Sequence, residues 1–184
     1  MSIPDLVQLL ASRSAKRGEF TLASGRASTL YIDARLTTMS PEGLRLIGAQ
    51  GLRALQDANW NVQSVGGLTL GADPIAYAIA YASAMTATPI RAFTVRKQTK
   101  AHGMGRLIEG PFRSGDRVAI VEDVITTGSS AITAANAIRD AGGQILGVLA
   151  LVDREEGGRE AVERQGFTVV ALTRASEIVA TMES

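Results

Sequence analysis

VAIVEDVITTGSS, the thirteen residues of Val118–Ser130, is the segment around which the chain is organised. Its first four residues are all apolar and predict a strand that is buried on both faces of a sheet. Thr126–Ser130 follows with hydroxyls, peptide N–H groups and one glycine, and a helical pattern begins immediately afterwards. In open α/β folds such a loop lies at the carboxyl edge of the sheet, where ligands bind. The stretch therefore predicts a binding loop between a central strand and a helix.

Two acidic residues, Glu122 and Asp123, stand between the apolar run and the loop. A helix N-terminus favours a bound anion, and two carboxylates can hold sugar hydroxyls or a hydrated Mg²⁺. The combination predicts a site for a phosphorylated sugar. The same residues could also do no more than end a strand and cap a helix. The sequence GxxxxGK[ST] does not occur, and the loop is not GxGxxG either.

Length and composition narrow the class of protein. The 184 residues are expected to form a single domain, 1–184, and the 46% hydrophobic share is typical of a soluble globular protein. The net charge of +1 argues against a nucleic-acid partner. The absence of cysteine excludes disulfides and cysteine-ligated metals, and a single histidine, His102, excludes a multi-histidine metal site. No apolar run is long enough for a membrane span and no signal peptide is recognisable, so a cytoplasmic location without membrane contact is expected.

Strands and helices alternate after residue 40, which predicts an α/β fold with a mostly parallel, twisted sheet and helices on both faces. An amino-terminal helix is expected to end at Gly18, and a hairpin or two short strands at Phe20–Arg35. A helix is expected to begin after Ser40. A glycine-rich loop is expected at Gly66–Pro74, with its peptide N–H groups close to phosphate oxygens. Strands are expected at Val62–Val65, Pro89–Val95, Val118–Val121, Gln144–Val152 and Phe167–Leu172.

The second informative stretch is Arg96–Gly110, which contains four cations, one histidine and three glycines. This composition suits neither a helix nor a strand and predicts a long mobile loop. The loop could be an ordinary solvated segment, or a nucleic-acid-binding loop, although it lacks aromatic residues for stacking bases. It could also be a lid that closes over an anionic substrate and excludes water.

Several motifs resemble a known family. Val118–Ser130 resembles the phosphoribosyl-pyrophosphate signature of the phosphoribosyltransferases at every position. The pattern RKxxKxHGxGxxIEG beginning at Arg96 is similar to the catalytic loop of the orotate phosphoribosyltransferases. Their amino-terminal segment is matched by Ser24, Gly25, Arg26, Ser28, Tyr31 and Asp33. The chain departs from many members at Ala23, where they carry a lysine, and from some members in having no lysine between Arg53 and Arg91.

The resemblance implies the type I phosphoribosyltransferase fold, with residues 1–38 forming an amino-terminal helix and a small hood, and residues 96–111 forming a mobile catalytic loop. It implies transfer of the phosphoribosyl group of 5-phospho-α-D-ribose 1-diphosphate (PRPP) to orotate, with Mg²⁺ as cofactor, giving orotidine 5′-phosphate and pyrophosphate in pyrimidine biosynthesis. It also implies a homodimer in which the loop reaches the neighbouring subunit's site. The alternatives are a phosphoribosyltransferase for another base and a non-catalytic regulator that binds PRPP.

The resemblance further implies roles for single residues. Lys100, His102 and Asp123 are the expected catalytic residues. Thr126 and Arg154 are expected to contact orotate, and an arginine at a strand end can hold a carboxylate with a bidentate fork. No direct protein ligand to the metal is expected, although Glu122 and Asp123 could reach it through water. The residues expected to bind PRPP are Arg96, Lys97, Lys100, His102, Glu122, Asp123, Val124, Ile125, Thr126, Thr127, Gly128, Ser129 and Ser130.

Overall fold

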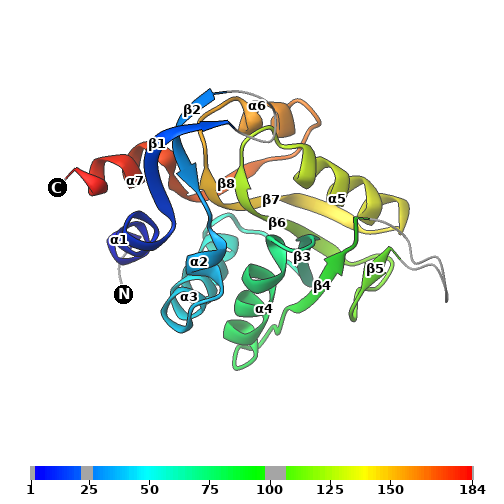
Figure 1. Cartoon of the computed structure of the whole chain (residues 1–184). Coiled ribbons are helices and arrows are strands. Elements are labelled where there is room, and N and C mark those ends of the chain that lie inside the picture. The colour runs from blue at the N-terminus through cyan, green and yellow to red at the C-terminus, as the bar shows by residue number, and fades with distance from the viewer. Residues whose placement is uncertain (1–2, 22–26, 98–106, 184) are drawn as a thin grey trace.

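The computed structural model describes residues 3–21, 27–97 and 107–183. Its centre is a six-stranded sheet with strand order β5-β4-β3-β6-β7-β8 (Figure 1). Every neighbouring pair in this sheet is parallel except β4 and β5, which are antiparallel. The six strands are β3 (Ser64–Leu68), β4 (Arg91–Val95), β5 (Ile108–Glu109), β6 (Arg117–Ile125), β7 (Gln144–Asp153) and β8 (Val169–Arg174). The predicted mostly parallel α/β sheet is confirmed.

Helices cover both faces of this sheet, as predicted. One face carries α1 (Ile3–Arg13), α3 (Pro41–Asp57), α4 (Ala72–Ser83) and α7 (Ala175–Met182), and the other carries α5 (Ser129–Asp140) and α6 (Gly158–Glu163). Successive residues of β6 divide between the two cores. Ala119 and Val121 pack in the first core, whereas Val118 and Ile120 pack in the second. A strand needs apolar residues at every position when both of its faces are buried, which explains the unbroken apolar run.

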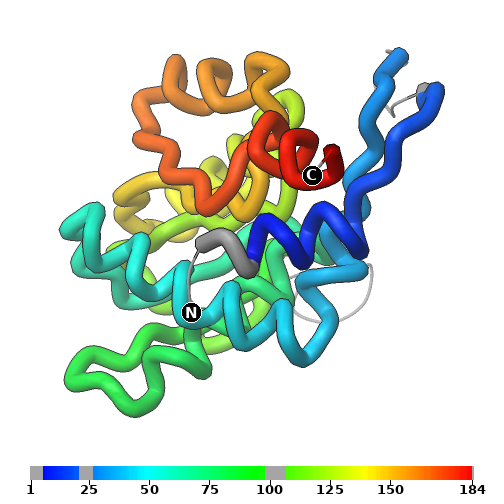
Figure 2. The backbone as a smooth tube through the Cα atoms, turned by 90° about the vertical axis from the view of Figure 1, so that its left-hand side faces the viewer, coloured from blue at the N-terminus to red at the C-terminus, as the bar shows by residue number. Residues whose placement is uncertain are grey.

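The amino-terminal segment forms a separate two-stranded antiparallel sheet from β1 (Ala15–Thr21) and β2 (Ala27–Ile32), followed by the short helix α2 (Arg35–Thr38). We call β1 and β2 the hood. Figure 2 shows these two strands extending away from the helices.

The expectation that Gly18 ends the first helix is wrong, because α1 ends at Arg13 and Gly18 lies inside β1. Pairing with β2 extends the strand into a region that local sequence assigns to the helix.

Three other boundaries differ from the sequence-based expectation. β6 continues through Glu122 and Asp123 to Ile125, so the two acids lie within the strand. β3 contains Gly66 and Gly67, which were expected in a loop. A Cβ atom at Gly67 would lie 2.1 Å from the carbonyl oxygen of Val121, so this glycine allows close packing inside the sheet. Part of the expected 96–111 loop is strand β5.

The helix predicted after Ser40 is confirmed. The Ser40 side chain accepts a hydrogen bond from the Gly43 N–H at 3.1 Å and caps α3, and Pro41 occupies the first turn. In the part of the chain that the structure describes, no helix is both long enough and apolar enough to cross a membrane.

Candidate active site

The carboxyl ends of the parallel strands meet at a cleft of about 340 Å³. The turn after β3 contributes Leu68–Gly71, and Lys97 follows β4. Thr126 and Arg154 follow β6 and β7, whose final residues Ile125 and Asp153 are paired in register. The cleft therefore gathers the residues that come after four adjacent strands, as the topology of an open α/β sheet requires.

The loop after β6 encloses a smaller pocket of about 130 Å³. Gly128 is the N-cap of α5 and has φ +78°, a left-handed conformation that glycine adopts without strain. It has no side chain to cap the helix, and the Ser129 N–H makes only a long hydrogen bond of 3.4 Å to the Thr127 hydroxyl, so the start of α5 can offer N–H groups to a ligand. The hydroxyl oxygens of Thr127 and Ser129 lie 3.1 Å apart at the pocket. These features make the pocket suitable for a phosphate group. Its lining consists of Glu122, Val124, Ile125, Thr126, Thr127, Gly128, Ser129 and Ser130.

Glu122 is buried at the base of the cleft, and its Oε2 atom has no hydrogen-bond partner among the described residues. Burial, reinforced by the neighbouring Asp123 carboxylate, raises the pKa of Glu122 to about 9. Lys97 opposes this shift only weakly. Glu122 therefore carries a proton at neutral pH in the unliganded protein.

Asp123 is held in a defined position beside it. Its Oδ1 atom accepts a hydrogen bond from the Val124 N–H at 2.8 Å. On the other side the carboxyl group lies against Gly71, where an added Cβ atom would be 2.5 Å from Cγ of Asp123. The close approach explains why glycine occupies position 71, although the backbone there is helical, with φ −62° and ψ −40°.

The turn between β3 and α4 is fixed by Asp73, a buried residue that the sequence interpretation missed. The Thr69 hydroxyl donates to Oδ2 of Asp73 at 2.7 Å, and the Thr94 hydroxyl donates to Oδ1 at 2.8 Å. The Thr69 N–H also donates to the Val95 carbonyl oxygen at 2.8 Å. Asp73 thus ties the wall of the cleft to the end of β4. The sequence interpretation placed Asp73 in the loop expected at Gly66–Pro74, whereas the structure places it in the first turn of α4.

The hood closes another side of the cleft with Tyr31 and Ile32, and Asp33 and Arg35 extend this wall. Arg35 Nε donates to Oδ1 of Asp33 at 2.8 Å, and this contact lowers the pKa of the Asp33 carboxyl group. The sequence interpretation included Tyr31 and Asp33 in the hood but did not identify Arg35 as a cleft residue. Arg35 adds a cation to the rim of the cleft.

The residues expected on the basic loop have different positions. Lys97 lines the cleft, whereas the Arg96 guanidinium contacts Glu109 of β5 at 3.4 Å. Lys100 and His102 lie outside the described residues, so their roles remain predictions. Within residues 3–21, 27–97 and 107–183 there is no group of three or more acidic or histidine side chains that could hold a metal ion.

Arg154 is buried, and its backbone N–H donates to the Ile125 carbonyl oxygen at 3.0 Å. Its guanidinium faces the cleft but already contacts Glu156 and the hood strand β2. Arg154 and Thr126 both line the cleft, and several N–H donors of Arg154 are already engaged by the protein, while their contact with orotate stays a prediction.

The chain is similar to orotate phosphoribosyltransferases over nearly its whole length. It is 48% identical to the orotate phosphoribosyltransferase of Aquifex aeolicus (strain VF5) over 177 residues, which are 95% of this chain and 96% of that protein. It is 48% identical to the enzyme of Mycobacterium tuberculosis H37Rv over 163 residues, 89% of this chain and 88% of that one. The chain belongs to the orotate phosphoribosyltransferase family. No family model matches it.

Solved structures agree with this family assignment. The orotate phosphoribosyltransferase of Mycobacterium tuberculosis H37Rv, crystallised in complex with PRPP, matches with a TM-score of 0.81 and 39% identity over 96% of this chain and 98% of that one. The adenine phosphoribosyltransferase of Saccharomyces cerevisiae matches with a TM-score of 0.68 at 19% identity and shares the fold alone. The predicted phosphoribosyltransferase fold is confirmed.

Proposed function

We propose that this chain carries out the reaction of its family with the residues of the cleft in defined roles. The reaction transfers the phosphoribosyl group of PRPP to orotate and yields orotidine 5′-phosphate and pyrophosphate, a step of pyrimidine biosynthesis. The observation that carries the proposal is the pair of pockets at the carboxyl edge. One pocket suits a phosphate group, and the adjoining cleft is lined by the buried Glu122, the half-buried Asp123 and Arg154.

Thr126–Ser130 bind the 5′-phosphate through their hydroxyls and the N–H groups at the start of α5. Glu122 and Asp123 bind the ribose hydroxyls. Because burial raises the pKa of Glu122 to about 9, its carboxyl group can donate a hydrogen bond to a ribose oxygen, whereas an Asp123 oxygen accepts one. The two acids therefore have complementary roles at adjacent ring positions.

Substitution at the anomeric carbon passes through a state with oxocarbenium character, by analogy with glycoside hydrolysis. The main tasks of the protein are then to position the reactants and to stabilise charge. Lys97, Lys100 and His102 supply cations for the departing pyrophosphate. Thr126 and Arg154 contact orotate. A purine has no carboxylate for Arg154, which favours orotate over purine bases.

Mg²⁺ is the proposed cofactor. The unpartnered Oε2 atom of Glu122 and the adjacent Asp123 carboxylate give an oxygen-rich surface that suits a hydrated Mg²⁺ held through water. When bound, the ion neutralises charge on the pyrophosphate group of PRPP.

A homodimer in the cytoplasm is the proposed working form. Tyr77 and Tyr81 on α4 are 52% and 85% exposed, and Met85, just after the helix, is 96% exposed. The two tyrosines border a groove between α3 and α4 of about 570 Å³, whose lining is mostly apolar side chains. An exposed apolar surface of this kind favours a protein partner. A second copy of the chain would cover it and would bring residues 96–111 to the neighbouring site.

The reaction is tested by measuring pyrophosphate release from PRPP with Mg²⁺, with orotate, uracil, adenine and hypoxanthine offered in parallel. Turnover with orotate alone is expected. Turnover with another base would refute the assignment of the base site but not of the phosphate site. Binding of PRPP without turnover on any base would indicate a regulator.

The shared loop is tested by mixing two inactive variants, Lys100→Ala and Asp123→Asn. If the loop serves the neighbouring site, hybrid dimers contain one intact site, and roughly a quarter of wild-type activity returns after subunit exchange. If each loop serves its own subunit, mixing restores nothing.

A further inference from the structure

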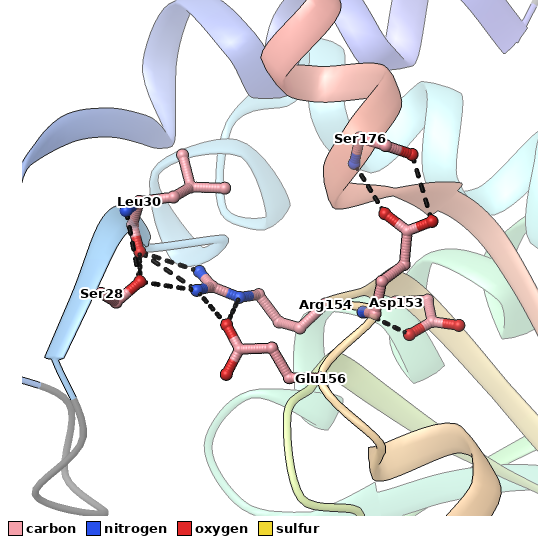
Figure 3. A network of polar contacts seen from close by, with 7 residues as sticks. Ser28, Leu30, Asp153, Arg154, Glu156 and Ser176 are labelled. Carbon is pink, nitrogen blue, oxygen red and sulfur yellow. Dashed lines mark hydrogen bonds and ion pairs between the residues drawn. The ribbon is translucent and has the colours of Figure 1, made fainter.

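The Arg154 side chain is held by two parts of the chain that are distant in sequence (Figure 3). Its Nε and Nη2 atoms donate to Oε1 of Glu156 at 3.1 and 2.6 Å. Its Nη1 and Nη2 atoms both donate to the Leu30 carbonyl oxygen at 3.1 Å, and Nη2 also lies 3.1 Å from the Ser28 hydroxyl oxygen. One guanidinium therefore joins the end of β7 to the hood strand β2.

These contacts use both forks of the guanidinium. A guanidinium has five N–H donors in a fixed plane, so each neighbouring pair of nitrogens can donate two hydrogen bonds to one acceptor group. Glu156 occupies the fork made by Nε and Nη2, and Leu30 occupies the fork made by the two Nη atoms. Among the described residues, only the remaining hydrogen on Nη1 lacks an acceptor. A ligand carboxylate cannot take a bidentate fork from Arg154 without displacing a protein group.

The turn that carries Glu156 is itself anchored. Glu155 has φ +58°, and its N–H donates to Oδ1 of Asp153 at 2.8 Å. Its carboxylate accepts hydrogen bonds from the N–H and the hydroxyl of Ser176, at 2.8 and 3.1 Å, in the first turn of α7. This anchoring holds the backbone of Glu156 in place, so that its carboxylate can orient the Arg154 guanidinium. The Arg154 side chain is only 5% exposed.

We propose that Glu156 is a positioning residue for orotate binding. By holding one fork of Arg154, it directs the other fork to the Leu30 carbonyl oxygen and so fixes β2, whose last two residues, Tyr31 and Ile32, line the cleft. A buried guanidinium without its carboxylate partner would move toward solvent and release the hood strand. The inference rests on the proposed contact of Arg154 with orotate in the cleft that the hood strand β2 lines.

The test compares Glu156→Ala and Glu156→Gln with wild type, with separate KM values for orotate and PRPP. Glu156→Ala is expected to raise the KM for orotate roughly 10- to 100-fold, the size associated with losing hydrogen bonds to a charged group. The KM for PRPP should stay within about twofold, because the phosphate pocket does not contain Glu156. Glu156→Gln keeps an acceptor oxygen at the same place and should restore most of the orotate affinity.

A second readout does not depend on turnover. Hydrogen exchange of the backbone amides of β2 should be faster in Glu156→Ala, while exchange in β6 should be unchanged. Glu160→Ala, which removes an exposed carboxylate on the neighbouring helix α6, is the matched control and should behave as wild type in both assays.

An unchanged KM for orotate in Glu156→Ala would overturn the proposal, as would a lowered one, which would mean that Glu156 competes with the substrate. Unchanged exchange in β2, or a Glu156→Gln variant as impaired as Glu156→Ala, would overturn it as well. If wild-type protein itself did not use orotate, the proposed function would have failed, and the exchange of β2 would still decide whether Glu156 fixes the hood.

Discussion

Gly71→Ala is the sharpest test of the position of Asp123. The backbone at Gly71 is helical, so alanine fits it and would normally add about 0.4–1 kcal/mol of stability through the unfolded chain. The obstacle is the side chain of Asp123. An added Cβ would lie 2.5 Å from its Cγ and Oδ2 atoms, whereas ordinary van der Waals contact begins at 3.4 Å. The carboxyl group must therefore retreat by about 0.9 Å from its position in the cleft, where we propose that it binds the ribose.

A displacement of about 1 Å in a positioning group can cost on the order of 10²-fold in rate. We therefore expect kcat/KM for PRPP to fall about 100-fold in Gly71→Ala, equivalent to about 2.7 kcal/mol of transition-state stabilisation. The free energy of unfolding should change by less than about 1 kcal/mol. The assays are steady-state pyrophosphate release at saturating orotate and denaturant unfolding of the same preparation.

Gly115→Ala is the matched control. Gly115 has φ +86°, and an added Cβ would meet nothing within 4 Å. This variant should lose about 1–2 kcal/mol of stability through backbone strain and keep wild-type kcat/KM. Normal kinetics in Gly71→Ala would refute the reasoning, because Asp123 would then be either free to move or unnecessary. A large loss of stability in Gly71→Ala would equally show that the contact had been misjudged.

Three further predictions concern other parts of the molecule. The pKa of Glu122 is raised from 4.5 to about 9, so between these values the folded state holds one more proton than the unfolded state. Its contribution to stability is complete below pH 4.5 and is lost as pH rises toward 9, by at most about 1.4 kcal/mol per pH unit. Denaturant unfolding without Mg²⁺ or PRPP at pH 6, 7 and 8 should show a smaller loss with rising pH in Glu122→Gln, and parallel profiles would contradict this. Lys100→Ala should lower kcat about 10²–10³-fold, the cost of losing one transition-state donor, and an unchanged kcat would remove Lys100 from the mechanism. Tyr81→Glu should yield monomers in light scattering, because it places a charge in the apolar surface of α4, and an intact dimer would place the interface elsewhere.

Much of the fold could be predicted from short stretches of sequence. Unbroken apolar runs such as Val118–Val121 identify strands buried on both faces, since only such strands have no face exposed to solvent that would require polar residues. Ser40 and Pro41 identify the start of α3 through local hydrogen bonding and a fixed φ. The loop at Thr126–Ser130 could be located because its glycine, its hydroxyl groups and the following helix lie within a few residues of one another in the sequence.

The sequence alone thus determined the α/β alternation, the binding loop and the family resemblance, all of which depend on neighbours along the chain. The role of a glycine in packing depends on tertiary contacts, since Gly67 lies against the Val121 carbonyl oxygen through the pairing of β3 with β6. Tertiary contacts also account for two features of the site. Arg154 is shared with Leu30, 124 residues away. The raised pKa of Glu122 follows from burial that no local pattern encodes. Strand order sets these contacts, and strand order results from the packing of the whole sheet.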